Sequence, residues 1–113
     1  MGRLVVSEII YEKLVRDRIP EIILADNQTP LTRILEETEY RQKLLEKLVE
    51  EAQELLESNG EIGERADVAE VLKALDVALG YTSEEIESIR AHKAKKRGGF
   101  EQQIYLEKVM SND

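Results

Sequence analysis

The chain has no cysteine or tryptophan, and its 113 residues include two prolines and one histidine. Without cysteine there is neither a disulfide framework nor a thiolate to bind a metal or attack a substrate. With a single histidine, few routes to a hydrolytic site remain. Both prolines, Pro20 and Pro30, lie in the first third of the chain, so no proline interrupts a helix from Leu31 onward.

Positive charge is also scarce: 16 lysines and arginines face 24 aspartates and glutamates, for a formal net charge of −8. Binding to a nucleic-acid backbone needs a basic surface, so we expect no nucleic-acid polymer as a partner. A nucleotide is still a possible ligand, because a bound divalent cation makes an acidic site attractive to phosphate. No apolar stretch is long enough to span a bilayer or act as a secretion signal, so we expect a cytoplasmic protein without a membrane partner.

Apolar residues recur at helical spacing through the rest of the chain. The pattern predicts three long helices, over residues 37–58, 62–79 and 82–97. Gly60 and Gly80 suit the left-handed position that ends a helix. Thr82 and Glu85 form a capping box that begins the third helix.

A short helix is expected before these three, with Pro20 near its first turn and the turn-prone segment ADNQTP at its end. We therefore expect an all-α protein that forms a single domain over residues 1–113. Its predicted parts are an N-terminal segment (1–35), a three-helix core (36–97) and a C-terminal tail (98–113).

The predicted helix over residues 62–79 is apolar on too many sides for a surface helix. Only Glu70, Lys73 and Asp76 form a polar strip. A helix of this kind is usually buried among several neighbours, and three helices can hardly surround it. We therefore expect a homodimer, in which a helical hairpin completes a four-helix bundle by dimerisation.

The helix over residues 37–58 has an apolar stripe that should mark its inward face. The stripe is expected to centre on Leu45, Leu48, Ala52 and Leu56. At about 100° per residue, Glu50 and Glu54 lie opposite this stripe and Glu51 lies at its edge.

Two acidic pairs flank the turn between the first two long helices: Glu51 with Glu54, and Glu64 with Asp67, each spaced i, i+3. Glu64 and Asp67 share their sectors with apolar residues, where an ionised carboxylate is costly unless it is paired or binds a metal. Four converging carboxylates suit Mg²⁺ or Mn²⁺ rather than zinc. The alternative is a solvated acidic face, in which the helix dipole favours Glu64.

The segments EEAQE (50–54) and ERAD (64–67) resemble the EExxE…ExxD signature of the MazG-like all-α nucleoside triphosphate pyrophosphohydrolases. That superfamily also contains the phosphoribosyl-ATP pyrophosphohydrolases. YEKLVRDRIPEII (11–23) and KAKKRGGF (93–100) resemble segments of its short, single-domain branch. The resemblance implies a Mg²⁺-dependent hydrolase, with Mn²⁺ as a substitute, that converts a nucleoside triphosphate to the monophosphate and pyrophosphate. It also implies a homodimer or a dimer of dimers.

The resemblance assigns roles to residues by position. The implied metal ligands are Glu51, Glu54, Glu64 and Asp67. Glu50 would hold a second metal or orient the attacking water, and is the implied catalytic residue. Only nine residues, 55–63, separate the two acidic motifs, which leaves little loop to shape a nucleobase pocket.

A basic cluster on the third long helix is a second candidate. Lys93, Lys96 and Arg97 lie at i, i+3 and i+4 and resemble the family's basic segment, which would bind the outer phosphates. Alternatively, they complement the dipole at the end of the helix.

Three functions stay open. The first is hydrolysis of a nucleoside triphosphate, including house-cleaning of non-standard nucleotides. The second is hydrolysis of phosphoribosyl-ATP in histidine biosynthesis. The third is a non-catalytic helical module that keeps the dimer.

Overall fold

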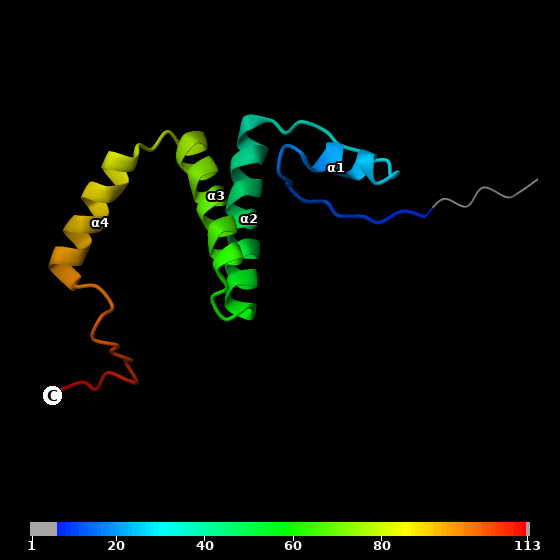
Figure 1. Ribbon diagram of the computed structural model, residues 1–113. Coiled ribbons are helices and arrows are strands. Elements are labelled where there is room, and N and C mark those ends of the chain that lie inside the picture. Colours follow the sequence, from blue (N-terminus) through cyan, green and yellow to red (C-terminus); the bar gives the residue numbers. More distant parts are fainter. Residues whose placement is uncertain (1–6, 113) are drawn as a thin grey trace, which may run out of the picture. The chain divides into compact units, whose positions relative to one another are not determined.

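The computed structural model describes residues 7–112, in which there are four helices and no strand (Figure 1). The helices are α1 (Ile19–Ala25), α2 (Glu37–Glu57), α3 (Ile62–Leu79) and α4 (Ser83–Arg97). The predicted all-α class is confirmed, and each predicted helix is present. The chain divides into two compact units, Met1–Gly80 and Tyr81–Asp113. The single domain and its three-helix core stay predictions, because each unit is described by itself.

Helix α1 owes its short length to the residues at its two ends. Pro20 lies in its first turn, where the missing N–H costs no helical hydrogen bond. At the other end, the N–H of Asp26 donates to the carbonyl of Ile22, and Asn27 has a φ of 58°. Asparagine tolerates this left-handed conformation better than most residues, so ADNQTP ends the helix as predicted.

Helices α2 and α3 form an antiparallel hairpin, and they lie side by side in Figure 1. Gly60, with a φ of 86°, donates its N–H to the carbonyl of Leu55 at 3.0 Å and so ends α2. Glu61 then caps α3, because its carboxylate accepts the N–H of Glu64 at 3.0 Å. These local contacts make the turn short and fix how far each helix extends beside the other.

The core of the first unit lies between these two helices. Its buried apolar side chains are Leu44, Val71 and Leu75. Half-buried apolar residues from the hairpin pack around them, together with Leu14 from the N-terminal segment. The core is therefore small, and Leu14 places its part of the N-terminal segment against the hairpin.

The predicted inward stripe of α2 is wrong except at Leu48, which packs against the core. Leu45 and Leu56 are 43% and 72% exposed, whereas Leu44 is 3% and Glu51 is 8% exposed. The helix carries two adjacent apolar stripes, about 100° apart. Packing against α3 buries the stripe that contains Leu44 and Glu51, so Glu51 faces inward rather than lying at an edge.

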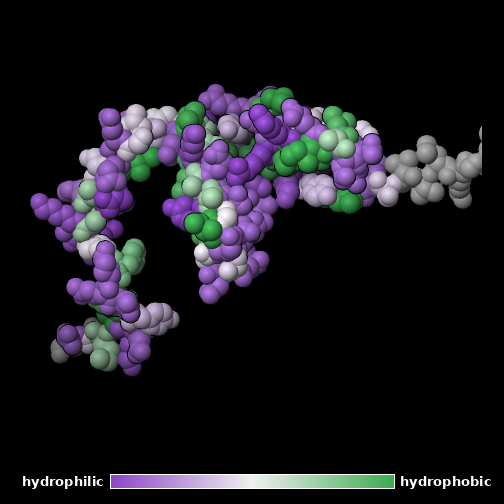
Figure 2. Space-filling view, in the orientation of Figure 1, coloured by the Kyte–Doolittle hydropathy of each residue, from purple (hydrophilic) through white to green (hydrophobic). Residues whose placement is uncertain are grey.

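The other apolar stripe of the hairpin stays at the surface. Figure 2 shows green, apolar side chains among the purple, charged ones over this part of the molecule. The large apolar residues exposed on α2 and α3 are Leu45, Val49, Leu56, Ile62, Leu72 and Val77. The hairpin therefore has apolar surface that the rest of the first unit does not cover, and the four-helix bundle stays a proposal.

The second unit consists of α4 and the segment after it. The hydroxyl of Thr82 accepts the N–H of Glu85 at 3.1 Å, which begins α4 as predicted. Gly98 follows the last helical residue with a φ of 85°. Among the described residues, no helix is both long enough and apolar enough to cross a bilayer.

The small core makes a direct stability prediction. Leu75→Ala removes a side chain that is 5% exposed, so it should lower the free energy of unfolding by about 2–5 kcal/mol. Leu31 is fully exposed, so Leu31→Ala should change the free energy of unfolding by less than about 0.5 kcal/mol. Urea unfolding followed by circular dichroism measures both. Equal losses in the two variants would contradict this core.

Candidate metal centre

The acidic residues of the two motifs meet across the hairpin. Their carboxylate oxygens form two groups of three, each within 4.8 Å of one another. One group consists of Glu50, Glu51 and Glu54; the other consists of Glu51, Glu64 and Asp67. Together they contain all five predicted residues, and Glu51 belongs to both. Glu51, Glu64 and Asp67 come together across the hairpin, whereas neither group joins Glu54 to Glu64 and Asp67. The convergence of all four predicted ligands on one ion, and the binding of an ion, stay predictions. We call these five residues the acidic cluster.

The antiparallel geometry explains this convergence. Glu51 lies six residues before the end of α2 at Glu57, and Asp67 lies five residues after the start of α3 at Ile62. Because each residue advances about 1.5 Å along a helix, these two positions come level with each other. Glu64 is one turn nearer the hairpin's end and shares its sector with the buried Val71.

Glu51 is the buried polar residue of this hairpin. Its Oε1 atom lies 3.3 Å from the Nζ atom of Lys47. Its Oε2 atom is buried without a hydrogen-bond partner, and so is Oε2 of Glu64. A buried acceptor without a donor costs about 1–3 kcal/mol, and more when it is charged. Carboxylate oxygens such as these two are the ligand atoms that a hard dication prefers.

The pKa values of the neighbouring residues Glu50 and Glu51 are shifted in opposite directions. Burial raises the pKa of Glu51, the neighbouring carboxylate of Glu54 raises it further, and Lys47 opposes both. Burial also acts to raise the pKa of Glu50, but the hydrogen bond from Lys13 and the charge of Lys47 outweigh it, so this pKa is lowered. Glu50 is therefore held ionised, whereas Glu51 is the carboxylate that needs a further cation or a proton.

Three cations touch the acidic cluster, and sequence reasoning assigned none of them to it. Lys47 lies 3.4 Å from Glu50 and 3.3 Å from Glu51, and its side chain is 15% exposed. Its i, i+4 spacing from Glu51 was a readable signal. Lys13 and Arg16 reach the cluster from the N-terminal segment, 37 and 51 residues away from their partners. No spacing rule connects residues so far apart.

The predicted phosphate-binding residues belong to the second unit. Lys93, Lys96 and Arg97 are exposed on the last turns of α4. Because the two units are described separately, the structure does not bring these residues together with the acidic cluster. Their binding of phosphate stays a prediction.

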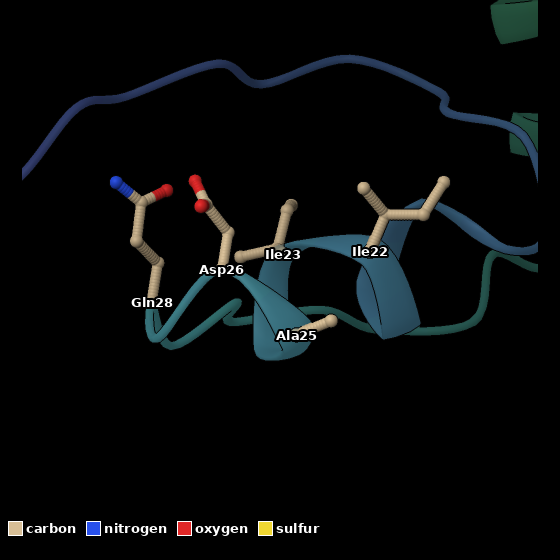
Figure 3. A pocket seen from close by; sticks show the side chains of 5 residues that line it. All are labelled: Ile22, Ile23, Ala25, Asp26 and Gln28. Atoms are coloured by element: carbon tan, nitrogen blue, oxygen red, sulfur yellow. The ribbon is translucent and has the colours of Figure 1, made fainter.

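Shallow, open depressions lie beside the first unit's elements, among them two next to α1 and α2. One of about 360 Å³ lies at the end of α1, where Asp26 and Gln28 point to the same side (Figure 3). The other, of about 230 Å³, borders Glu50 between the N-terminal segment and α2. The second is the relevant one, because Lys13 and Lys47 line it and both contact Glu50.

Comparisons with known proteins give one short match. A protein of Mycolicibacterium smegmatis, described as uncharacterized, is 54% identical over 43 residues, which are 38% of this chain and 44% of that protein. The matched residues thus span less than half the length of that relative. No family model matches the chain, and no solved structure gives a significant match. These comparisons assign neither a family nor an activity.

Because the pKa values of Glu50 and Glu51 are shifted in opposite directions, replacing each with glutamine should have opposite effects on the free energy of unfolding in a chelating buffer. The pKa of Glu51 is higher in the folded chain than in the unfolded chain. The free energy of unfolding therefore falls as the pH rises from the unfolded-state pKa through the folded-state pKa, because Glu51 becomes ionised in the folded chain. Glu51→Gln should therefore raise the free energy of unfolding at pH 7. This gain should disappear in acid, where Glu51 is protonated.

Glu50 provides the matched comparison. The pKa of Glu50 is lower in the folded chain than in the unfolded chain. Its ionised form therefore stabilises the folded chain at pH values above the unfolded-state pKa, and this stabilisation is lost as the pH falls through the folded-state pKa. Glu50→Gln should lower the free energy of unfolding at pH 7 by up to about 1 kcal/mol. Urea unfolding at pH 7 and in acid measures both variants. Effects of the same sign at pH 7 would contradict these assignments.

Proposed function

We propose that the protein is a Mg²⁺-dependent nucleoside triphosphate pyrophosphohydrolase that releases a nucleoside monophosphate and pyrophosphate. The observation that carries this proposal is the buried Glu51, which is shared by two groups of carboxylates and has an oxygen without a proton donor. The donors are carboxylates from Glu and Asp alone, which suits Mg²⁺ or Mn²⁺. The resemblance of EEAQE and ERAD to the pyrophosphohydrolase signature supplies the reaction.

The five carboxylates divide naturally into two sites. Glu51, Glu64 and Asp67 would hold one Mg²⁺, and Glu54 with Glu50 would complete a second site on the other side of Glu51. Bound there, Mg²⁺ would neutralise phosphate charge and acidify a water molecule. Phosphoryl and nucleotidyl transfer need mainly such positioning and charge neutralisation, so no protein nucleophile is required.

Glu50 has two alternative roles: it would either complete that second site or orient the attacking water. Its lowered pKa keeps the carboxylate ionised, so it can accept a hydrogen bond from that water without taking the proton. The water oxygen forms a bond to the α-phosphorus, the bond from the α-phosphorus to the bridging oxygen breaks, and pyrophosphate leaves with that oxygen. The proton from the water passes to solvent or to the departing pyrophosphate.

A substrate panel tests the reaction. Purified protein should release pyrophosphate, and no orthophosphate, from at least one nucleoside triphosphate in the presence of Mg²⁺ or Mn²⁺. The panel should include non-standard nucleotides and phosphoribosyl-ATP, because turnover of the latter alone would place the protein in histidine biosynthesis. The absence of both turnover and metal binding would leave the non-catalytic helical module.

Glu64→Gln tests the site directly. We expect this variant to lose metal-dependent pyrophosphate release, because it removes a ligand charge. It should retain or gain stability in a chelating buffer, since one charge leaves a repelling cluster. Glu57→Gln is the control: Glu57 is exposed near the end of α2 and lies outside both groups of carboxylates. Full activity of Glu64→Gln would refute this metal centre.

We also propose that the protein is a homodimer or a dimer of dimers, with the exposed apolar residues of the hairpin at the interface. Sedimentation equilibrium should then give two or four times the chain mass of 13.0 kDa. Val77→Lys places a charge on an apolar position that is 79% exposed, and it should shift the protein toward the monomer. Lys73→Gln, on the polar strip of α3, should not. A monomeric wild-type protein would contradict the proposal.

A further inference from the structure

The N-terminal segment is attached to the acidic cluster by charge. Arg16 donates from Nη2 to Oδ1 of Asp67 at 2.8 Å, and Lys13 donates to Oε1 of Glu50 at 3.3 Å. Between them, Leu14 packs against the core. Residues 7–18 form neither helix nor strand, so these three side chains hold this part of the segment.

The carboxylate of Asp67 can bind either Arg16 or a dication, but the two cations would compete for it. It belongs to the group of carboxylates with Glu51 and Glu64, and it is also the partner of Arg16. A dication bound by that group would repel the guanidinium beside it. The ion pair is exposed, with 57% and 41% of the two side chains accessible. Exposed pairs are weak, so Arg16 can leave Asp67 when a better partner is present.

We propose that Arg16 is a shared cation, which holds Asp67 until a dication takes that carboxylate and then binds the phosphates of the nucleotide. This inference rests on the proposed function and adds a phosphate-binding residue from the N-terminal segment. It differs from the sequence-based prediction, which gave that role to Lys93, Lys96 and Arg97.

The chemistry of the segment fits phosphate. A guanidinium presents a planar fork of donors that matches phosphate oxygens, and a phosphate brings more negative charge than one carboxylate. Lys13, three residues before Arg16, is a second cation of the same segment that contacts the acidic cluster. It lines the cavity of about 230 Å³, whose lysines are balanced by Glu12, Glu46 and Glu50, so the phosphate role rests on Arg16.

Calorimetry on the full-length chain separates the two roles of Arg16. The first probe is Mn²⁺ alone, and the second is inorganic tripolyphosphate with saturating Mn²⁺, which contains the phosphates without a base. The variants are Arg16→Gln and, as control, Arg33→Gln. Arg33 makes an ion pair of the same length, 2.8 Å, with Glu39, which lies outside the acidic cluster.

Arg16→Gln should bind Mn²⁺ about two- to fivefold more tightly, because no ion pair has to be broken. It should bind tripolyphosphate about tenfold or more weakly, because a charged hydrogen-bond donor is lost. Arg33→Gln should match the wild type with both probes. Arg16→Lys, which keeps the charge, should bind tripolyphosphate with intermediate affinity.

Other results would overturn the inference in distinguishable ways. If wild type binds Mn²⁺ and releases pyrophosphate while Arg16→Gln behaves like Arg33→Gln, the shared cation is refuted and the proposed function stands. Weaker Mn²⁺ binding by Arg16→Gln refutes the competition, and unchanged tripolyphosphate binding refutes the phosphate role. A wild type that neither binds Mn²⁺ nor releases pyrophosphate refutes the proposed function, and this inference with it.

Discussion

The burial of one carboxylate, that of Glu51, is the constraint on which the rest of this structure depends. The hairpin has three buried apolar residues, and Glu51 is buried in the same hairpin with one oxygen unpartnered and the other paired with Lys47. Domains of this size are stable by only about 5–15 kcal/mol, so an incompletely compensated buried charge takes a notable share of the total. A cation that binds between α2 and α3 would offset this cost. If the proposed metal binds there, its binding and the stability of the hairpin would be coupled.

The acidic cluster is compensated in two physically different ways. Lys47 is largely buried on the same helix as Glu50 and Glu51, so it is a fixed part of the cluster. Arg16 and Lys13 are exposed and come from an irregular segment, so their ion pairs can exchange partners at little cost. Under the proposed function, a cluster with one fixed and two exchangeable cations would bind a dication and a polyanion in turn without a large rearrangement.

The sequence predicted what depends on local rules and failed where contacts between helices decide. The bounds of α3 and α4 follow from capping by Thr82 and from Gly80, which are local signals. The inward placement of Glu64 followed from its shared sector with Val71. The stripe on α2 was predicted wrongly, because two adjacent apolar stripes compete and only the contact with α3 selects one.

The cations of the N-terminal segment lay beyond any spacing rule, since 51 residues separate Arg16 from Asp67. Their charges were visible in the sequence, but their partners were not. Helical periodicity fixes neighbours within one element, whereas the position of an irregular segment depends on tertiary contacts such as that of Leu14 with the core.

Anomalous diffraction from crystals grown with Mn²⁺ tests the central claim most directly. The account predicts a manganese peak between α2 and α3, coordinated by oxygens of Glu51, Glu64 and Asp67. If those carboxylates instead pair only with Lys47 and Arg16 at saturating Mn²⁺, and no manganese peak lies among them, the metal centre and the proposed hydrolase are wrong.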